Sequence, residues 1–505
     1  MIKSWLIDCI ENHRNCDKAI LEVTYPVTPQ RLIAVTGRLR LVELDSMSDD
    51  ETYAALSHCW GRSPRFKTTK QSVRSLKRGI DPDLLPRTFQ DAIELTRKLR
   101  IDYLWIDALC ILQDSEEDWQ AESTLMGYYY RNAHLTISAL DASDGSRGFL
   151  HTDRTTLSAR IDDTESWREA GLSWGDTFRQ SPLSRRGWVL QERLLSRRIL
   201  HFAKDELLWE CMECSARERT AECSKGDNGK RVIGPRQIDD GTTIQIARWY
   251  DVICQYSGLD LTFDHDVLAA IEGVSSTFME ATGLHYAAGL WQEHLPYGLL
   301  WYCEHVRLLH SDSVAPTWSW ASRRGPVKML CNPPDWMLRI TEEKPANELS
   351  AMNARLETLS IAEIDVDMED EKLGMRLSIE AWSIQVLCSS SSGTQAPFDD
   401  PDLRRIISIH EGFGPRIGTG YWDSIPGADF VACTAILLMQ APDDCWDSQQ
   451  NTMITYFLLI KEAEDGEGRI VFERIGIGCT VDLLEGQNLD NTWLKNTQRR
   501  SFTLR

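Results

Sequence analysis

The chain has 505 residues and carries 76 acidic against 55 basic residues, a formal net charge of −21. This length predicts two or three domains with sizeable cores. The acidic balance argues against sequence-independent binding to nucleic acid, which requires Lys and Arg to neutralise phosphates. The fourteen cysteines are dispersed and show no small disulfide framework, so we expect reduced thiols.

We expect neither a signal peptide nor a membrane-spanning segment. The apolar run after Met1 is too short for a signal peptide. No segment approaches the roughly 20 apolar residues of a membrane span. We therefore expect a soluble, cytoplasmic protein with no membrane span.

The N-terminal segment, residues 1–48, places two thiols and an imidazole at helical spacing, at Cys9, His13 and Cys16. One helix face can present all three, which is one ligand short of a closed zinc site. No fourth ligand is visible near them in the sequence. We therefore predict no metal here, and an amphipathic helix with buried thiols instead.

A short apolar strand is predicted at Tyr53–Leu56, and reactive and turn-forming residues follow it from Ser57 to Gly61. The carboxyl end of such a strand is where ligands bind in open α/β sheets. A helix is then predicted from Thr88 to about Arg100, because apolar residues recur at helical spacing. This order makes the loop after the first strand a candidate site.

The alternation of strand and helix continues. The spacing predicts a strand at Tyr103–Ile106, a helix that begins near Ser115, and a strand at His134–Ala139. Two further strands are predicted within residues 199–211. The pattern predicts a doubly wound, mainly parallel α/β sheet, with its domain at residues 49–215.

Three regions with other patterns follow. Residues 216–242 are rich in Gly and charged types and are predicted to be a linker. Residues 243–325 show helical periodicity and are predicted to form a helical module. Residues 326–505 alternate with period two, as in Met375–Trp382, and are predicted to be antiparallel and β-rich.

The sequence motifs argue against nucleotide hydrolysis, a cysteine nucleophile and a zinc finger. No phosphate-binding loop follows a predicted strand, so hydrolysis of nucleoside triphosphates is disfavoured. His58 and Cys59 suggest a thiol nucleophile with its base, but neighbours on a strand point to opposite faces. Cys110 is interpreted as a small buried hydrophobe. Cys211 and Cys214 lack a second pair at zinc-finger distance, so packing at a strand end is favoured.

Four stretches in this order resemble the fungal heterokaryon incompatibility (HET) domain. They are YAALSHCWG at 53–61, YLWIDALCILQ at 103–113, HLTISAL at 134–140 and RGWVLQE at 186–192. The resemblance implies an effector of non-self recognition that triggers programmed cell death together with an unknown protein partner, and self-association is consistent with it.

The order of elements is also similar to that of Toll/interleukin-type receptor (TIR) domains, whose Trp-x-x-x-Glu helix Trp188–Glu192 resembles. The match departs from the usual pattern in Val189, where cysteine is common, and in the long insertion at 141–182. The resemblance implies that Glu192 is catalytic and cleaves NAD, which is then a substrate and not a cofactor. For substrate binding, Trp60 or Trp188 can stack on an aromatic ring of NAD, while Ser57 and the backbone near Gly61 bind its polar groups and Asp107 borders the same cleft.

Two functions therefore remain open, an NAD glycohydrolase and a non-catalytic interaction module that assembles with partners. For Asp107 alone, capping of the next turn is the simpler interpretation. Geometry discriminates between the two functions. A Glu192 carboxylate that faces a cleft bordered by Ser57, Trp60 and Asp107 favours the enzyme, whereas one sealed in a salt bridge favours the interaction module.

Overall fold

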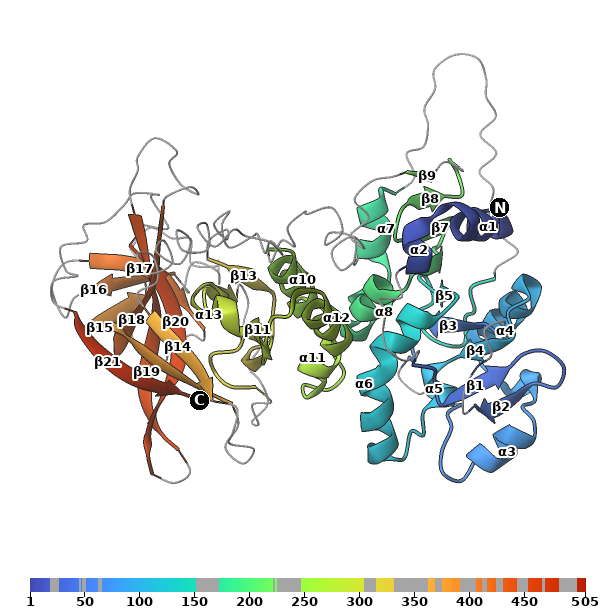
Figure 1. Ribbon diagram of the computed structural model, residues 1–505, viewed down its shortest axis with the longest axis horizontal. Helices are drawn as coiled ribbons and strands as arrows, with labels where there is room; N and C mark the ends of the chain where they lie inside the picture. The colour runs from blue at the N-terminus through green and yellow to red at the C-terminus, as the bar shows by residue number, and fades with distance from the viewer. Residues whose placement is uncertain are drawn as a thin grey trace, which may run out of the picture. The chain divides into compact units, whose positions relative to one another are not determined.

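The structure, a computed structural model, describes residues 1–18, 27–44, 47, 51–61, 66–150, 172–220, 223–224, 247–303, 315–330, 362–367, 375–390, 406–410, 416–423, 430–442, 453–465, 468–480 and 497–505. The chain divides into two compact units (Figure 1). The first unit comprises Met1–Arg236, Asp260–Thr262 and Ala269–Thr277. The second comprises Gln237–Leu259, Phe263–Leu268 and Phe278–Arg505. No helix among the described residues is long and apolar enough to cross a membrane.

The first unit is built on a nine-stranded sheet of order β2-β1-β4-β3-β5-β6-β7-β8-β9. Its four central strands are parallel, in the order β4 (Tyr103–Trp105), β3 (Tyr53–Ser57), β5 (Leu135–Ser138) and β6 (Arg198–Phe202). Every residue of β3, β5 and β6 is buried, as expected for strands covered on both faces. The prediction that these four stretches share one parallel sheet is confirmed.

Both edges of this sheet are antiparallel, so the sheet as a whole is mixed. One edge consists of β1 (Arg31–Ala34) and β2 (Arg40–Glu43). The other consists of β7 (Leu207–Cys211), β8 (Ser215–Arg217) and β9 (Cys223–Ser224). Antiparallel neighbours can be joined by a short hairpin, whereas parallel neighbours need a crossover connection, usually a helix. The sheet is therefore mainly parallel only at its centre.

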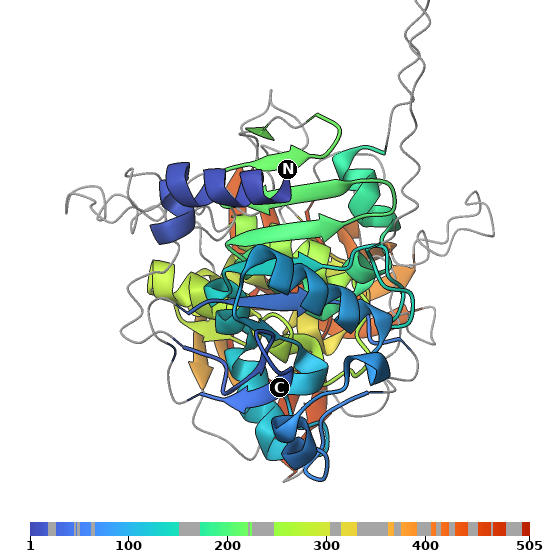
Figure 2. The same ribbon diagram turned by 90° about the vertical axis from the view of Figure 1, so that its right-hand side faces the viewer.

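Helices cover both faces of the sheet. In Figure 1, α4 lies on one side of the strands and α6 with α8 on the other, and Figure 2 shows α1 and α4 in front of the sheet. The unit is therefore an α/β fold with a mainly parallel central sheet and helices on both faces. The helices of the unit are α1 (Ile2–Asn12), α2 (Arg14–Lys18), α3 (Val73–Arg78), α4 (Arg87–Leu99), α5 (Asp107–Cys110), α6 (Glu116–Asn132), α7 (Trp174–Gln180) and α8 (Gly187–Leu195), with η1 (Pro82–Leu84) and η2 (Leu183–Arg185).

The strand order creates a crevice at β3. The chain passes from β3 through α4 to β4 on one side, and then through α6 to β5 on the other side of β3. Such a reversal opens a space at the carboxyl ends of the strands, where α/β proteins bind ligands. Ser57 is the last residue of β3, and Asp107 comes two residues after β4. The topology thus brings the ends of two motif stretches together.

The second unit begins with helices and short strands. They are α10 (Ala247–Ser257), η4 (Gln292–His294), α13 (Leu295–Gly298) and η5 (Trp320–Ser322), with the pairs β10 (Tyr286–Ala287) and β11 (Leu290–Trp291), and β12 (Trp301–Cys303) and β13 (Val327–Met329). Two further helices, α11 (Asp266–Ala269) and α12 (Glu272–Thr282), are divided between the units, because Ala269–Thr277 belongs to the first. Five tryptophans are fully buried there, Trp249, Trp291, Trp301, Trp318 and Trp320. The described part of this region combines helices with four short strands around these buried aromatic side chains, and the helical module at residues 243–325 stays a prediction.

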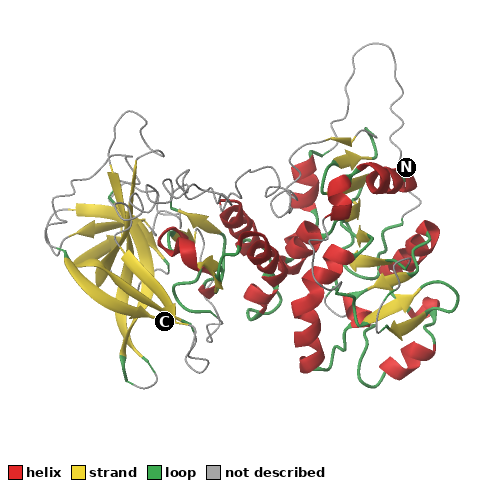
Figure 3. Ribbon diagram, in the orientation of Figure 1, coloured by secondary structure: helices red, strands yellow, loops and turns green. Residues whose placement is uncertain are grey.

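The second unit ends in an eight-stranded sheet (Figure 3). Its strands are β14 (Ala362–Asp367), β15 (Arg376–Ser390), β16 (Ile406–His410), β17 (Arg416–Trp422), β18 (Phe430–Pro442), β19 (Met453–Glu464), β20 (Ile470–Cys479) and β21 (Gln498–Leu504). All its pairings are antiparallel except β20 with β21. Along β15, Leu377 and Ile379 are buried while Ser378 and Glu380 are exposed, which confirms the period-two prediction.

Candidate functional site

A cavity of about 490 Å³ lies at the carboxyl end of β3. Two predicted site residues, Trp60 and Gly61, line it, whereas Ser57, Asp107, Trp188 and Glu192 do not. Its wall is strongly aromatic and also carries polar groups. The lining residues are His58, Cys59, Trp60, Gly61, Phe66, Leu84, Leu85, Pro86, Arg87, Phe89, Ala108, Asp144, Gly145 and Ser146. Such a wall suits a ligand with an aromatic ring and polar substituents.

Asp107 fixes the position of Trp60. The Trp60 indole Nε1 donates a hydrogen bond to Asp107 Oδ2 at 2.6 Å. The other oxygen, Oδ1, accepts from the Ala108 backbone N–H at 2.7 Å. Both carboxylate oxygens are engaged, so Asp107, the first residue of α5, orients the indole at the cavity wall and is itself held by the first turn of its helix.

Gly61 is required at its position by backbone conformation and by a close approach. Its φ is +72°, in the left-handed region, and a Cβ added there would lie 2.7 Å from the Asp144 Cβ. Asp144 lines the same cavity. A side chain at Gly61 would therefore displace one wall of the cavity.

Replacing Gly61 with alanine should destabilise the first unit by about 1–2 kcal/mol for the left-handed conformation alone, plus the cost of moving Asp144. Gly37→Ala is the matched control, since Gly37 has a φ of +67° and no atom within 4 Å of an added Cβ. Urea denaturation of both variants measures the difference. Equal losses in the two variants would show that the contact with Asp144 has no effect.

His58 is held by aromatic neighbours. Its side chain is buried, lies edge-on to Phe89 at 5.1 Å between ring centroids, and stacks on Trp60 at 6.4 Å. Burial lowers the pKa of His58, and burial raises the pKa of Cys59. Both residues line the cavity because the strand ends at Ser57, so strand alternation no longer separates them. Both pKa shifts disfavour the thiolate–imidazolium pair that a cysteine nucleophile and its histidine form.

Glu192 lies buried on α8, with 4% of its surface exposed. Burial raises its pKa to about 7, while the Arg186 charge and the Ser57 hydroxyl lower it in part. Its Oε2 has no hydrogen-bond partner. Among the described ion pairs none includes Glu192, so the carboxylate is buried without being sealed in a salt bridge.

Two residues that the sequence analysis did not assign to the site lie beside Glu192. Arg186 donates a hydrogen bond to the His58 carbonyl oxygen, and it connects the start of α8 to the loop after β3. The Tyr130 hydroxyl donates to the Leu56 carbonyl at 3.1 Å and also lowers the pKa of Glu192. Arg186 lies in the RGWVLQE stretch, which could have identified it, whereas Tyr130 lies in a helix with no such signal.

Trp188 packs against a helix and does not line the cavity. Its indole lies edge-on to that of Trp119 on α6, at 6.4 Å between ring centroids. The side chain is half-buried and contacts the core of the first unit. Its expected role in substrate binding, stacking on an aromatic ring, therefore stays a prediction, and the contact in the structure is a packing contact.

The titration of Glu192 should make stability depend on pH. Its pKa is about 7 in the folded protein against an ordinary 4.5, so the folded state holds the proton more tightly. The contribution of Glu192 to stability is therefore greatest below pH 4.5 and is lost as the pH rises through about 7. Relative to wild type, Glu192→Gln should gain up to roughly 3 kcal/mol between about pH 5 and about pH 8. Urea denaturation of both proteins at the two pH values measures this gain in the free energy of unfolding. A difference between variant and wild type that does not change with pH would contradict the prediction.

Residues 53–192 match the family model described as Heterokaryon incompatibility protein (HET). The chain contains a HET domain. The matched range begins at the first residue of β3 and ends at Glu192, so it includes every predicted site residue. No curated protein matches the chain, and no solved structure matches it.

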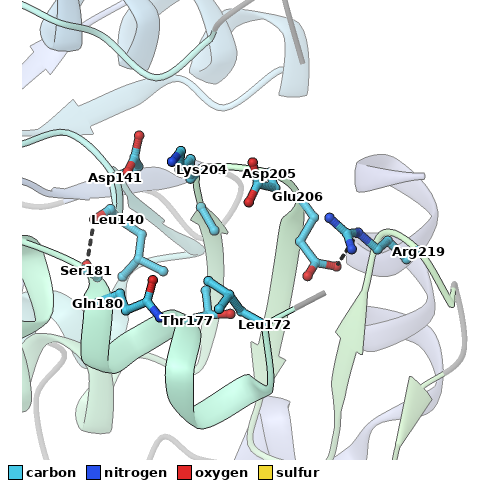
Figure 4. A pocket seen from close by; sticks show the side chains of 11 residues that line it. Leu140, Asp141, Leu172, Thr177, Gln180, Ser181, Lys204, Asp205, Glu206 and Arg219 are labelled. Carbon is cyan, nitrogen blue, oxygen red and sulfur yellow. Dashed lines mark hydrogen bonds and ion pairs between the residues drawn. The ribbon is translucent and has the colours of Figure 1, made fainter. Parts of the chain in front are cut away.

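A second cavity of the first unit, of about 210 Å³, lies between α7 and the turn that joins β6 and β7 (Figure 4). Charged residues from this turn line it, and Glu206 is paired with Arg217 and Arg219. None of the predicted site residues reaches it. The first cavity is therefore the better candidate for the ligand site of the HET domain.

The structure also groups the N-terminal Cys9, His13 and Cys16 with a residue distant in sequence, Cys211 at the end of β7. All four side chains are buried. The expectation of no metal in this segment rested on the lack of a fourth ligand, and the fold supplies that ligand. Cys214 is disulfide-bonded, which departs from the expectation of reduced thiols throughout.

Proposed function

We propose that the chain is a HET-domain effector of fungal non-self recognition, or vegetative incompatibility, which promotes programmed cell death by cleaving NAD at a TIR-like site. The HET match over residues 53–192 supports the first part. The observation that carries the second is Glu192, a buried carboxylate with an unpaired oxygen and a pKa near 7. Strongly perturbed carboxylates of this kind occur preferentially at functional sites.

The reaction needs few groups from the protein. The bond between C1′ of the ribose and the nicotinamide nitrogen breaks, and its electron pair goes to nicotinamide. Water adds to C1′ and loses a proton, which gives ADP-ribose. The transition state resembles an oxocarbenium ion, so an ionised Glu192 can stabilise the developing positive charge. In this reaction NAD is the substrate, and no metal or other cofactor is required.

The cavity offers matching contacts for this substrate. Trp60, held by Asp107, presents an aromatic face for a nicotinamide or adenine ring. The backbone at Gly61 packs directly against Asp144, and both residues line the cavity. Glu192 is only 4% exposed, so a substrate can reach it only if the residues that bury it move. The hydrogen bond from Arg186 to the His58 carbonyl is one of the contacts that has to open.

The alternative is a non-catalytic module that assembles with partners. The burial of Glu192, which lies outside the cavity lining, favours it. In this case the HET domain acts through a contact surface, with a protein partner of incompatibility signalling or by self-association. Both proposals place the protein in the cytoplasm, with neither nucleic acid nor a membrane span as a requirement.

Incubation of the purified full chain with NAD tests the proposal, with released nicotinamide measured by chromatography. Expression of the same chain in fungal cells measures cell death in parallel. We expect nicotinamide release together with cell death. Cell death without nicotinamide release would exclude the enzymatic mechanism and leave the interaction module.

A further inference from the structure

Four potential metal ligands converge at one edge of the nine-stranded sheet. Cys9 lies on α1, His13 follows that helix, Cys16 lies on α2 and Cys211 ends β7. Their ligand atoms all lie within 4.8 Å of one another, and all four residues are buried. His13 Nδ1 is 3.3 Å from Cys211 Sγ although 198 residues separate them.

We propose that Cys9, His13, Cys16 and Cys211 bind one zinc ion in a closed structural site. Three thiolates and one imidazole form a standard donor set for structural zinc, and the site is tetrahedral. With Zn–S bonds of about 2.3 Å, two sulfur ligands of a tetrahedron stand about 3.8 Å apart. The observed ligand separations, within 4.8 Å, therefore need only small side-chain shifts to close around an ion.

The surroundings of the four residues fit a metal centre. Arg198 is buried and its Nε donates to Cys9 Sγ at 3.3 Å. Three thiolates and one zinc ion carry about one net negative charge, and the Arg198 cation lies beside that charge and balances it. The Cys214 backbone N–H donates to Cys211 Sγ at 3.4 Å. His13 Nε2 lies 3.9 Å from Asp8 Oδ2, while Nδ1 faces the sulfur. Such outer contacts orient ligands in known metal sites.

The competing interpretation, buried thiols without a metal, explains these contacts less well. Three cysteines and a histidine from segments far apart converge on one point, whereas packing of small apolar groups needs no histidine. Cys9, Cys16 and Cys211 form no disulfide bond. The Cys214 sulfur is 3.8 Å from that of Cys211, but its disulfide removes it from the ligand set.

The position of the site predicts its role. It fastens α1 and α2 to β7, next to β6 at the end of the parallel strands. No coordination position remains open for a substrate, so the zinc is structural and not catalytic. Because zinc binds the folded arrangement and not the open chain, its loss should weaken the attachment of the N-terminal helices. This inference is independent of NAD cleavage.

The zinc content of the full chain tests the proposal. The purified protein should contain about one zinc per chain by elemental analysis. Cys211→Ser should lose it, whereas His13→Cys should retain it, because four thiolates also form a closed zinc site. Cys110→Ala is the matched control, since Cys110 is an equally buried free thiol of the same unit outside the cluster.

A second measurement does not depend on the folding of any variant. Wild-type protein is exposed to a thiol-alkylating reagent with and without a strong chelator, and the modified cysteines are mapped by mass spectrometry. Chelation should expose Cys9, Cys16 and Cys211 together while Cys110 stays protected. A wild-type chain that holds no zinc after expression in zinc-supplemented medium, or equal alkylation with and without chelator, would overturn the proposal.

Discussion

Glu192→Gln should reduce NAD cleavage by about a hundredfold or more, as the loss of one electrostatic stabiliser does in other enzymes. Glutamine keeps the shape of the side chain but removes the charge that stabilises the oxocarbenium-like transition state. The protein should still fold. Glu192 lies outside any described ion pair, so the change removes a buried charge without leaving another unpaired. Nicotinamide release and the melting temperature are measured on the same preparation.

A matched control separates chemistry from burial. Glu122 is also a buried glutamate with a raised pKa and an unpaired oxygen, but it lies near Arg31, at 3.7 Å, and lines neither described cavity. Glu122→Gln should leave nicotinamide release unchanged. Trp188→Ala should lower stability through its lost contact with Trp119. A Glu192→Gln protein that is folded and still cleaves NAD at the wild-type rate would rule out the catalytic role.

Asp423→Ala should lower the free energy of unfolding of the second unit by about 3–5 kcal/mol, because it leaves a buried cation without its counter-ion. Arg474 and Asp423 form an ion pair at 2.7 Å, and neither side chain is exposed to solvent. Arg474 also donates to the Leu299 carbonyl at 2.6 Å and lies over the Trp301 ring. Urea denaturation of the full chain measures the loss.

The same sheet provides the control for this prediction. Glu380 and Arg499 form an ion pair on exposed faces of β15 and β21. Glu380→Gln should change the free energy of unfolding by only about 0–1 kcal/mol, since solvent screens an exposed pair. A similar effect in the two variants would show that burial does not set the strength of the Arg474 pair.

The sequence by itself determined the local elements and the HET domain at residues 53–192. Apolar runs such as Tyr53–Leu56 predicted buried strands, and helical spacing predicted α4 and its end near Arg100. These predictions succeed because hydrophobic periodicity reports which face of an element is buried. The HET match confirmed the resemblance that the four motif stretches gave.

Only the tertiary structure decided how those elements meet. Burial of Glu192 depends on the packing of α8 near Ser57 and Tyr130, which no local pattern encodes. The hydrogen bond between Trp60 and Asp107 joins two loops that follow different strands. Cys211 joins the N-terminal cysteines across almost two hundred residues. Sequence patterns act over one or two helical turns, whereas such contacts arise from the order of strands in the sheet.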